Sequence, residues 1–255
     1  MIPLRDDIPS QRTPLVNYLV IVICTFAFLA QQTSDDDSMS IIERYALVPV
    51  RLTQPDVTPV IEQPVAIQTP FGVQISSQKI PLAPPAVPIW ATLITCMLLH
   101  GGWMHFIGNM WFLYIFGDNV EDRLGHFGFA LLYLGTGILA GLAHLVSDPS
   151  SSIPTLGASG AIAGVMGAYA LLYPHARVLA VLPILFILTF VIPAPVFLGI
   201  WFIMQITNGV GSMAGGAAGG VAWWAHAGGF VAGAIAALLI GRSPLGHAAV
   251  TERRF

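Results

Sequence analysis

Apolar residues gather along this chain in long runs, several of which approach the roughly 20 residues that a helix needs to cross about 30 Å of hydrocarbon. The second and fourth runs are short, so their helices must be shielded by neighbours or must end in a water-filled cavity, where polar chemistry at membrane depth is tolerated. We predict an all-α membrane protein with six spans: Leu15–Ala30, Trp103–Phe116, Phe127–Val146, Ser159–Tyr173, Leu182–Ile206 and Val221–Ile240.

The segments outside these runs are polar or rich in proline and glycine. Residues 31–88 carry scattered charges and many prolines, which forbid long helices and allow short extended pieces, so we predict a long extramembrane loop. Ile89–Leu99 is too short to span and is expected at the interface or re-entering the bundle. The predicted membrane domain covers residues 15–241, flanked by tails over 1–14 and 242–255.

Composition agrees with a membrane protein and excludes one class of partner. Of 255 residues, 55% are hydrophobic and 9% charged, and the mean hydropathy is +0.76. A net charge of −3 without a basic run argues against a nucleic-acid partner. Cys24 and Cys96 both lie in apolar runs and are interpreted as packing residues. We expect no cofactor.

Basic residues predict the orientation in the bilayer. If the N-terminus is cytoplasmic, that side collects seven arginines, whereas the opposite side keeps Arg44, Arg51 and Lys79. Both termini are therefore predicted inside, and the 31–88 loop and the glycine-rich Gly209–Gly220 loop outside. The inside arginines are Arg5, Arg12, Arg123, Arg177, Arg242, Arg253 and Arg254.

Ser159 opens the fourth span in a Gly-Ala-Ser-Gly turn. The unpaired backbone N–H groups of a first helical turn carry partial positive charge and can hold an oxyanion if the serine attacks a carbonyl. Such small residues also let membrane helices pack closely, so this turn alone leaves both interpretations open.

Three further polar side chains are predicted at the depth of Ser159. His226 lies about one and a half turns into a span that starts on the outer side, and His105 and Asn109 share one face near the outer start of the second span. Polar groups within the membrane cost free energy unless partnered, and they are functional by default. Each could instead be an interhelical hydrogen-bonding residue.

These residues fit nucleophilic catalysis by a dyad. Aspartate and glutamate are absent from every predicted span, which removes the third member of a Ser-His-Asp triad. A neutral His226 can take the proton of Ser159, while Asn109, His105 and the Ser159 N–H act as oxyanion donors. His100 and His144 add no metal site, because no carboxylate or cysteine completes one.

Small-residue spacings predict which helices meet. Ala225, Gly229 and Gly233 in the sixth span, and Gly160 and Gly164 in the fourth, mark faces where backbones approach closely. Contact between these spans is what a Ser159–His226 hydrogen bond requires.

Three motifs together resemble one family. HGGWMHFIGN (His100–Asn109) continuing into FGDNVEDRLG, then GASG with Ser159, then AWWAHAGGFVAG (Ala222–Gly233) resemble the rhomboid intramembrane serine proteases of the bacterial six-span type. The resemblance covers about Trp90 to Gly241. It implies a rhomboid-like six-helix bundle that cleaves transmembrane segments through an acyl-enzyme. The implied roles are Ser159 as nucleophile, His226 as base, and His105 and Asn109 as oxyanion donors.

The sequence departs from the family at two places. Some members carry a tyrosine four residues after the serine that stacks on the histidine, whereas this chain has Ala163. The long loop lacks the Trp-Arg pair that some members show. The fifth span, with Pro193 and Pro195 and the aromatic residues Trp201 and Phe202, is a candidate lateral gate for substrate, although a proline-kinked aromatic helix is also compatible with static packing.

The expected partners are the lipid bilayer and single-span membrane proteins whose segment unwinds near the outer face, because a serine protease needs an extended peptide. We expect a multi-pass protein of the bacterial inner membrane whose site opens outward. Two alternatives are a rhomboid-like pseudoprotease that binds membrane proteins without cutting them, and a small transporter with broken helices. The four polar site residues argue against the first, and the absence of spanning carboxylates argues against the second.

Overall fold

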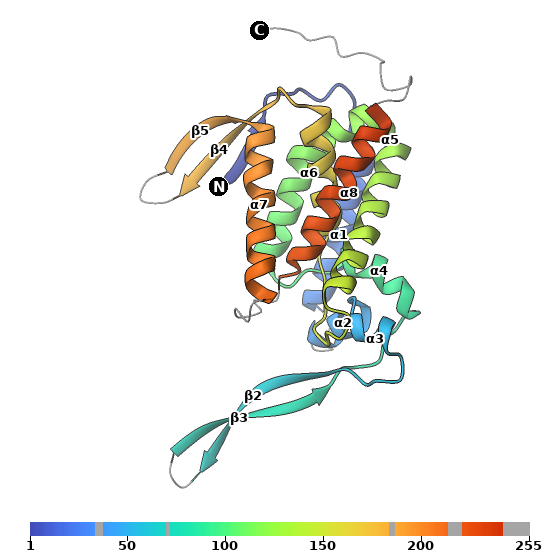
Figure 1. Cartoon of the computed structure of the whole chain (residues 1–255), viewed down its shortest axis with the longest axis vertical. Coiled ribbons are helices and arrows are strands. Elements are labelled where there is room, and N and C mark those ends of the chain that lie inside the picture. Colours follow the sequence, from blue (N-terminus) through green and yellow to red (C-terminus); the bar gives the residue numbers. More distant parts are fainter. Residues whose placement is uncertain (34–37, 70–71, 184–186, 214–220, 242–255) are drawn as a thin grey trace.

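The apolar runs form helices that pack side by side in a computed structural model, which describes residues 1–33, 38–69, 72–183, 187–213 and 221–241 (Figure 1). Within these residues, four helices are long and apolar enough to cross a membrane, and α6 is apolar but shorter. The six-span count stays a prediction. The bundle helices are α1 (Leu15–Thr33), α5 (Trp103–Ser147), α6 (Ser159–Leu172), α7 (Ala194–Met213) and α8 (Trp223–Gly241).

The turn predicted between the second and third spans, Gly117–His126, is largely helical, so ending the second span at Phe116 was wrong. Helix α5 runs through this segment and is interrupted at Gly125, whose φ of 71° and ψ of 166° are not helical. An acidic residue of this helical segment is buried against α1. Glu121 accepts hydrogen bonds from the backbone N–H groups of Val16 (2.9 Å) and Asn17 (2.7 Å), in the first turn of α1.

Helix α6 lies against α8 along a glycine seam, as the small-residue spacings predicted. A Cβ added at Gly229 would collide with the carbonyl oxygen of Gly160, and one at Gly233 with that of Gly164. On another side, the space beside Gly164 is filled by Thr136 of α5. Because the two backbones touch, no larger side chain fits at these positions without separating the helices.

The fifth span is shorter than predicted, because the first part of Leu182–Ile206 is extended. Strands β4 (Arg177–Pro183) and β5 (Ile187–Pro193) form an antiparallel hairpin, and β4 also pairs with the N-terminal strand β1 (Ile2–Asp6). Prolines at 183 and 193 break a helix, and the β-branched residues between them favour strands.

The start and the end of α7 also differ from the prediction. Helix α7 starts after Pro193, with Pro195 in its first turn, where a missing N–H costs no hydrogen bond. The two prolines therefore precede and start the helix, and they do not kink it. Its last residues, Gly209–Met213, were predicted as the beginning of a loop. The rest of that loop, 214–220, and the tail 242–255 lie outside the described residues.

The segment between α1 and α5 is built from short elements, as its prolines predicted. After its β-hairpin, this segment forms three consecutive short helices within Ile89–Leu99, the stretch predicted to lie at the interface or to re-enter the bundle. The hairpin β2–β3 projects beyond the bundle at the end where α8 begins, and the β1–β4–β5 sheet lies beside α7 near the other end (Figure 1). The elements are α2 (Ser38–Tyr45), α3 (Pro49–Thr53), β2 (Val60–Thr69), β3 (Gly72–Pro81), η1 (Ile89–Ala91), α4 (Thr92–Thr95) and η2 (Cys96–Leu98).

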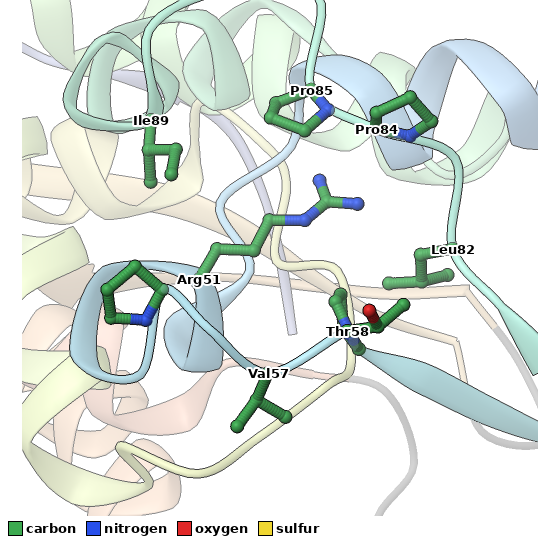
Figure 2. A pocket seen from close by; sticks show the side chains of 9 residues that line it. Arg51, Val57, Thr58, Leu82, Pro84, Pro85 and Ile89 are labelled. Carbon is green, nitrogen blue, oxygen red and sulfur yellow. The ribbon is translucent and has the colours of Figure 1, made fainter.

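A pocket opens at the base of the β2–β3 hairpin, and its lining includes neither Ser159 nor His226 (Figure 2). Arg51 lies in its wall with 6% of its surface exposed, and its guanidinium donates to the carbonyl oxygens of Glu43 and Ala83. These bonds join α3 to α2 and to the chain that leaves the hairpin. Prolines and aliphatic residues make up most of the remaining wall.

Candidate active site

Ser159 is the first residue of α6, and it follows a turn that only glycine adopts easily. Gly157 has a φ of 124°, and its N–H donates to the carbonyl oxygen of Cys96 at 2.9 Å. The helix begins two residues after this turn, so Ser159 lies in the first turn of α6, whose N–H groups have no partner within the helix. Ser159 stays half-buried, whereas the following residues Gly160–Tyr169 are all buried.

The Ser159 hydroxyl meets the ring of His226. Oγ lies 2.7 Å from Nε2, which is hydrogen-bonding distance. Ser159 comes from α6 and His226 from α8, and the glycine seam between these helices brings the two side chains within reach. The structure thus brings together the two residues that the sequence predicted as a dyad.

The other ring nitrogen of His226 also has a partner, which the sequence analysis missed. Nδ1 lies 2.8 Å from Oε1 of Gln205, a buried residue of α7. The rings of Trp201 and Trp223 flank the imidazole, with centroids 5.9 and 6.3 Å from its own. Ala163, where some family members carry a stacking tyrosine, is fully buried. A lone glutamine within an apolar span was the signal available in the sequence.

His105 borders the same site with its ring held in one tautomer. Its Nδ1 accepts a hydrogen bond of 3.2 Å from the N–H of Gly101, so in a neutral ring the proton sits on Nε2. A Cβ built on Gly157 would lie 2.8 Å from this Nε2 and 3.4 Å from Ser159 Oγ. The space left open by Gly157 is therefore bordered by an N–H donor and by the serine hydroxyl.

Asn109 lies one turn further along α5 and is buried. Its Nδ2 donates to the carbonyl oxygen of His105 at 2.9 Å, which leaves the second hydrogen of the amide for another acceptor. In this structure the amide therefore bonds to its own helix and makes no hydrogen bond to Ser159 or His226.

The two aromatic residues predicted as a gate lie where α7 meets α8. The ring of Trp201 packs near His226, and its centroid lies 6.2 Å from that of Phe230. Phe202 stacks on Phe230 with centroids 4.7 Å apart. Both gate candidates therefore hold α7 against the helix that carries the catalytic histidine candidate.

The remaining histidines and cysteines do not assemble into a metal centre within the described part of the chain. No group of three or more histidine, cysteine, aspartate or glutamate side chains there is arranged to hold an ion. The ring centroids of His100 and His105 are 5.4 Å apart, and no carboxylate or thiolate joins them. Cys24 and Cys96 are buried free thiols.

Comparison with known proteins places this arrangement in one family. The rhomboid domain model matches residues 88–243, which is more than half of the chain. Rhomboid-like protein 11, chloroplastic, from Arabidopsis thaliana is 41% identical over 78 residues, covering 31% of this chain and 28% of that protein. Two relatives from Bacillus subtilis (strain 168) carry protease names. Putative rhomboid protease YdcA is 39% identical over 80 residues and Rhomboid protease GluP 40% identical over 79 residues, each over 31% of this chain.

The region matched by the family model contains the residues of the candidate site, since it includes α5, α6, α7 and α8. The chain spans less than half the length of these curated relatives, with 40% of YdcA and 15% of GluP covered. Apolar helices and the family match together indicate a multi-pass membrane protein. This chain belongs to the rhomboid family.

Proposed function

We propose that this protein is a serine endopeptidase that cleaves transmembrane segments of single-span membrane proteins. The observation that carries the proposal is the 2.7 Å contact between Ser159 Oγ and His226 Nε2 at the start of α6, in a bundle of apolar helices. The protease names of YdcA and GluP support the same reaction class.

In the proposed first step, His226 Nε2 takes the proton from Ser159 as Oγ attacks the carbonyl carbon of the scissile peptide bond. The carbonyl oxygen becomes an oxyanion, which the Ser159 N–H and the Nε2–H of His105 stabilise, with Asn109 as a third donor after its amide turns from its helix. Each such donor is worth about 10²–10³ in rate.

Collapse of this intermediate breaks the C–N bond, and His226 returns the proton to the leaving amine. The acyl group then remains on Ser159. A water molecule, deprotonated by His226, attacks the ester and releases the second product, which restores the serine. Ser159 is only half-buried, so water and substrate can reach it.

The substrate has to present an extended peptide, because a helix hides its carbonyl groups. We propose that it unwinds near the outer face of a bacterial inner membrane, with both termini of the enzyme in the cytoplasm. The arginine distribution supports this orientation. Entry past Trp201 and Phe202 is the proposed route, since both lie where α7 meets α8 and the ring of Trp201 packs near His226.

The test is cleavage of a tagged single-span substrate in liposomes by the wild type, Ser159→Ala and His226→Ala. We expect product from the wild type alone, and labelling of Ser159 by a fluorophosphonate probe in the wild type only. Ser212→Ala, at an unrelated serine near the end of α7, serves as the matched control and should stay active. If no substrate of a panel is cleaved and the probe does not label Ser159, the protein is a rhomboid-like pseudoprotease and the protease proposal is wrong.

A further inference from the structure

The contact between Ser159 and His226 does not by itself determine which ring nitrogen of His226 carries the proton. An imidazole can serve as base toward Ser159 only if Nε2 is unprotonated, so the single ring proton has to sit on Nδ1. In serine proteases with a triad, a carboxylate enforces that tautomer. In the described residues of this chain no carboxylate contacts His226, and its Nδ1 partner is the side-chain amide of Gln205.

The orientation of the Gln205 amide follows from its second contact. Nε2 of Gln205 lies 3.2 Å from the backbone carbonyl oxygen of Trp201, one turn earlier on α7. A carbonyl only accepts hydrogen bonds, so the NH₂ end of the amide faces Trp201 and the oxygen faces His226. The oxygen likewise only accepts, so His226 Nδ1 has to be the donor.

We propose that Gln205 is the positioning residue of the catalytic base, holding His226 in the tautomer with Nδ1 protonated and Nε2 free for the Ser159 proton. Gln205 makes hydrogen bonds to His226 and Trp201 and none to the serine, so it acts through His226. This inference rests on the proposed protease function for its kinetic part only, since the tautomer is a property of the resting protein.

An amide suits this role at membrane depth better than a carboxylate. An ionised side chain within a span costs about 2.5–3.5 kcal/mol on insertion scales, whereas a hydrogen-bonded amide stays neutral. With 5% of its surface exposed, Gln205 has little access to water, and both ends of its amide are hydrogen-bonded. It supplies the directional acceptor of a triad without placing a charge there.

The acceptor also belongs to a different helix from the base. Gln205 is carried by α7, and α7 packs on α8 through the Phe202–Phe230 stack and the Trp201 ring. Displacement of α7 would take the amide oxygen away from His226. The correct tautomer of the base therefore depends on α7 lying against α8.

The experiment compares three variants on α7. Gln205→Leu removes the acceptor at similar size. Gln205→Glu keeps one, because a neutral carboxylic acid can donate to the Trp201 carbonyl and accept from His226. Met204→Leu, at the exposed neighbouring position, controls for altered packing of α7. We expect Gln205→Leu to lower kcat about 10–100-fold with KM within twofold, Gln205→Glu to recover at least a tenth of wild-type kcat at mildly acidic pH, and Met204→Leu to match the wild type.

Nitrogen NMR of histidine-labelled protein in bilayer discs reads the tautomer without any substrate. We expect the wild type to show His226 protonated at Nδ1, and Gln205→Leu to show a mixture of tautomers. A Gln205→Leu variant with unchanged kcat and an unchanged His226 tautomer would overturn the proposal. If the wild type cleaves nothing while its tautomer still depends on Gln205, the protease assignment fails and the positioning role stands.

Discussion

At one end of α6, the polar side chains of the candidate site are neutral in the proposed mechanism: His226, His105 and Asn109 near Ser159, and Gln205 behind His226. Near the other end, about 15 Å away at 1.5 Å per residue, the Tyr169 hydroxyl donates to the carboxylate of Asp6. The polar cluster at that end, called the Asp6 cluster below, consists of Asp6, Asn119, Tyr169, Glu121 and Asp122.

The carboxylates of the Asp6 cluster are engaged in hydrogen bonds, although the buried Oδ1 of its Asn119 has no hydrogen-bond partner. In the Asp6 cluster, Asp6 also accepts from Asn119 Nδ2 at 2.8 Å, and Asp122 accepts from the backbone N–H of Arg12 at 2.9 Å. Around Ser159, by contrast, only one hydrogen of the Asn109 amide is used in a hydrogen bond, and a space stays open beside Gly157.

This difference separates two uses of polarity in a membrane protein. Asp6 accepts from side chains of the bundle, and Glu121 and Asp122 accept from backbone N–H groups. These engaged carboxylates fix the N-terminal strand and α1 to the bundle. A site that has to hold a changing charge keeps donors free for it instead. We therefore expect substitutions around Ser159 to lower activity more than stability, and substitutions in the Asp6 cluster to do the reverse.

Apart from loss of the dyad itself, the largest effect on activity is expected from His105→Phe. Phenylalanine keeps an aromatic ring beside His100 but loses the Nε2–H that borders the space next to Gly157. We predict cleavage lowered by about 10²–10³-fold. Because His105 is exposed, the unfolding midpoint should stay near that of the wild type. Liposome cleavage rates and thermal unfolding in detergent measure the two properties.

His175→Phe, at an exposed histidine in the turn after α6, is the matched control for this substitution and should change neither property. Parallel loss of activity and stability in His105→Phe would mean that the ring supports the fold and would break the contrast between the two clusters.

The largest effect on stability is expected from Glu121→Leu. Only 1% of Glu121 is exposed, and its two carboxylate oxygens accept from the first-turn N–H groups of α1. Leucine leaves these donors without that partner, at about 1–3 kcal/mol each. Unfolding in mixed micelles should show the loss, while kcat per folded molecule stays within twofold of the wild type.

Glu62→Leu, an exposed glutamate of the β2–β3 hairpin, controls for the change of charge and should keep the wild-type stability. An unchanged unfolding free energy in Glu121→Leu would show that water replaces the carboxylate at the start of α1.

Sequence reasoning located the site better than it located the ends of the helices. Ser159, His226 and the glycines of the seam were found because polar and small residues stand out in apolar runs. The β4–β5 hairpin was missed, since an apolar run of this length predicts a span. Only the prolines at 183 and 193 indicated that the helix begins later.

Partners from distant segments were harder to predict. Gln205 was missed because nothing in the local sequence of α7 shows that it faces His226, 21 positions away. The role of Glu121 at the start of α1 was missed for the same reason, as its partners there lie 104 and 105 positions earlier. Such pairings are set by how the helices pack, which a hydrophobic pattern does not specify.

The smallest effect is expected from Asp6→Asn, and it is a change in how the free energy of unfolding depends on pH. Burial is the main cause that raises the pKa of the Asp6 carboxyl from 3.8 to about 6, with the neighbouring Asp7 adding to it. Between these values the folded protein holds a proton that the unfolded chain has lost. The free energy of unfolding therefore falls as pH rises through this window, and it is flat with respect to this group above pH 6.

Because Asp6 is partly exposed, we expect its share of this fall to be on the order of 1–2 kcal/mol. Asparagine does not titrate, and its Oδ1 can accept from both Tyr169 and Asn119. The variant should therefore lose the contribution of Asp6 to the pH dependence and keep the hydrogen bonds that hold the strand to the bundle. Unfolding at pH 4.5 and pH 7 measures the difference, with Asp56→Asn on an exposed loop as control. An equal fall in wild type and Asp6→Asn would mean that another group titrates in this window, and that Asp6 joins the strand to the bundle without changing its protonation state.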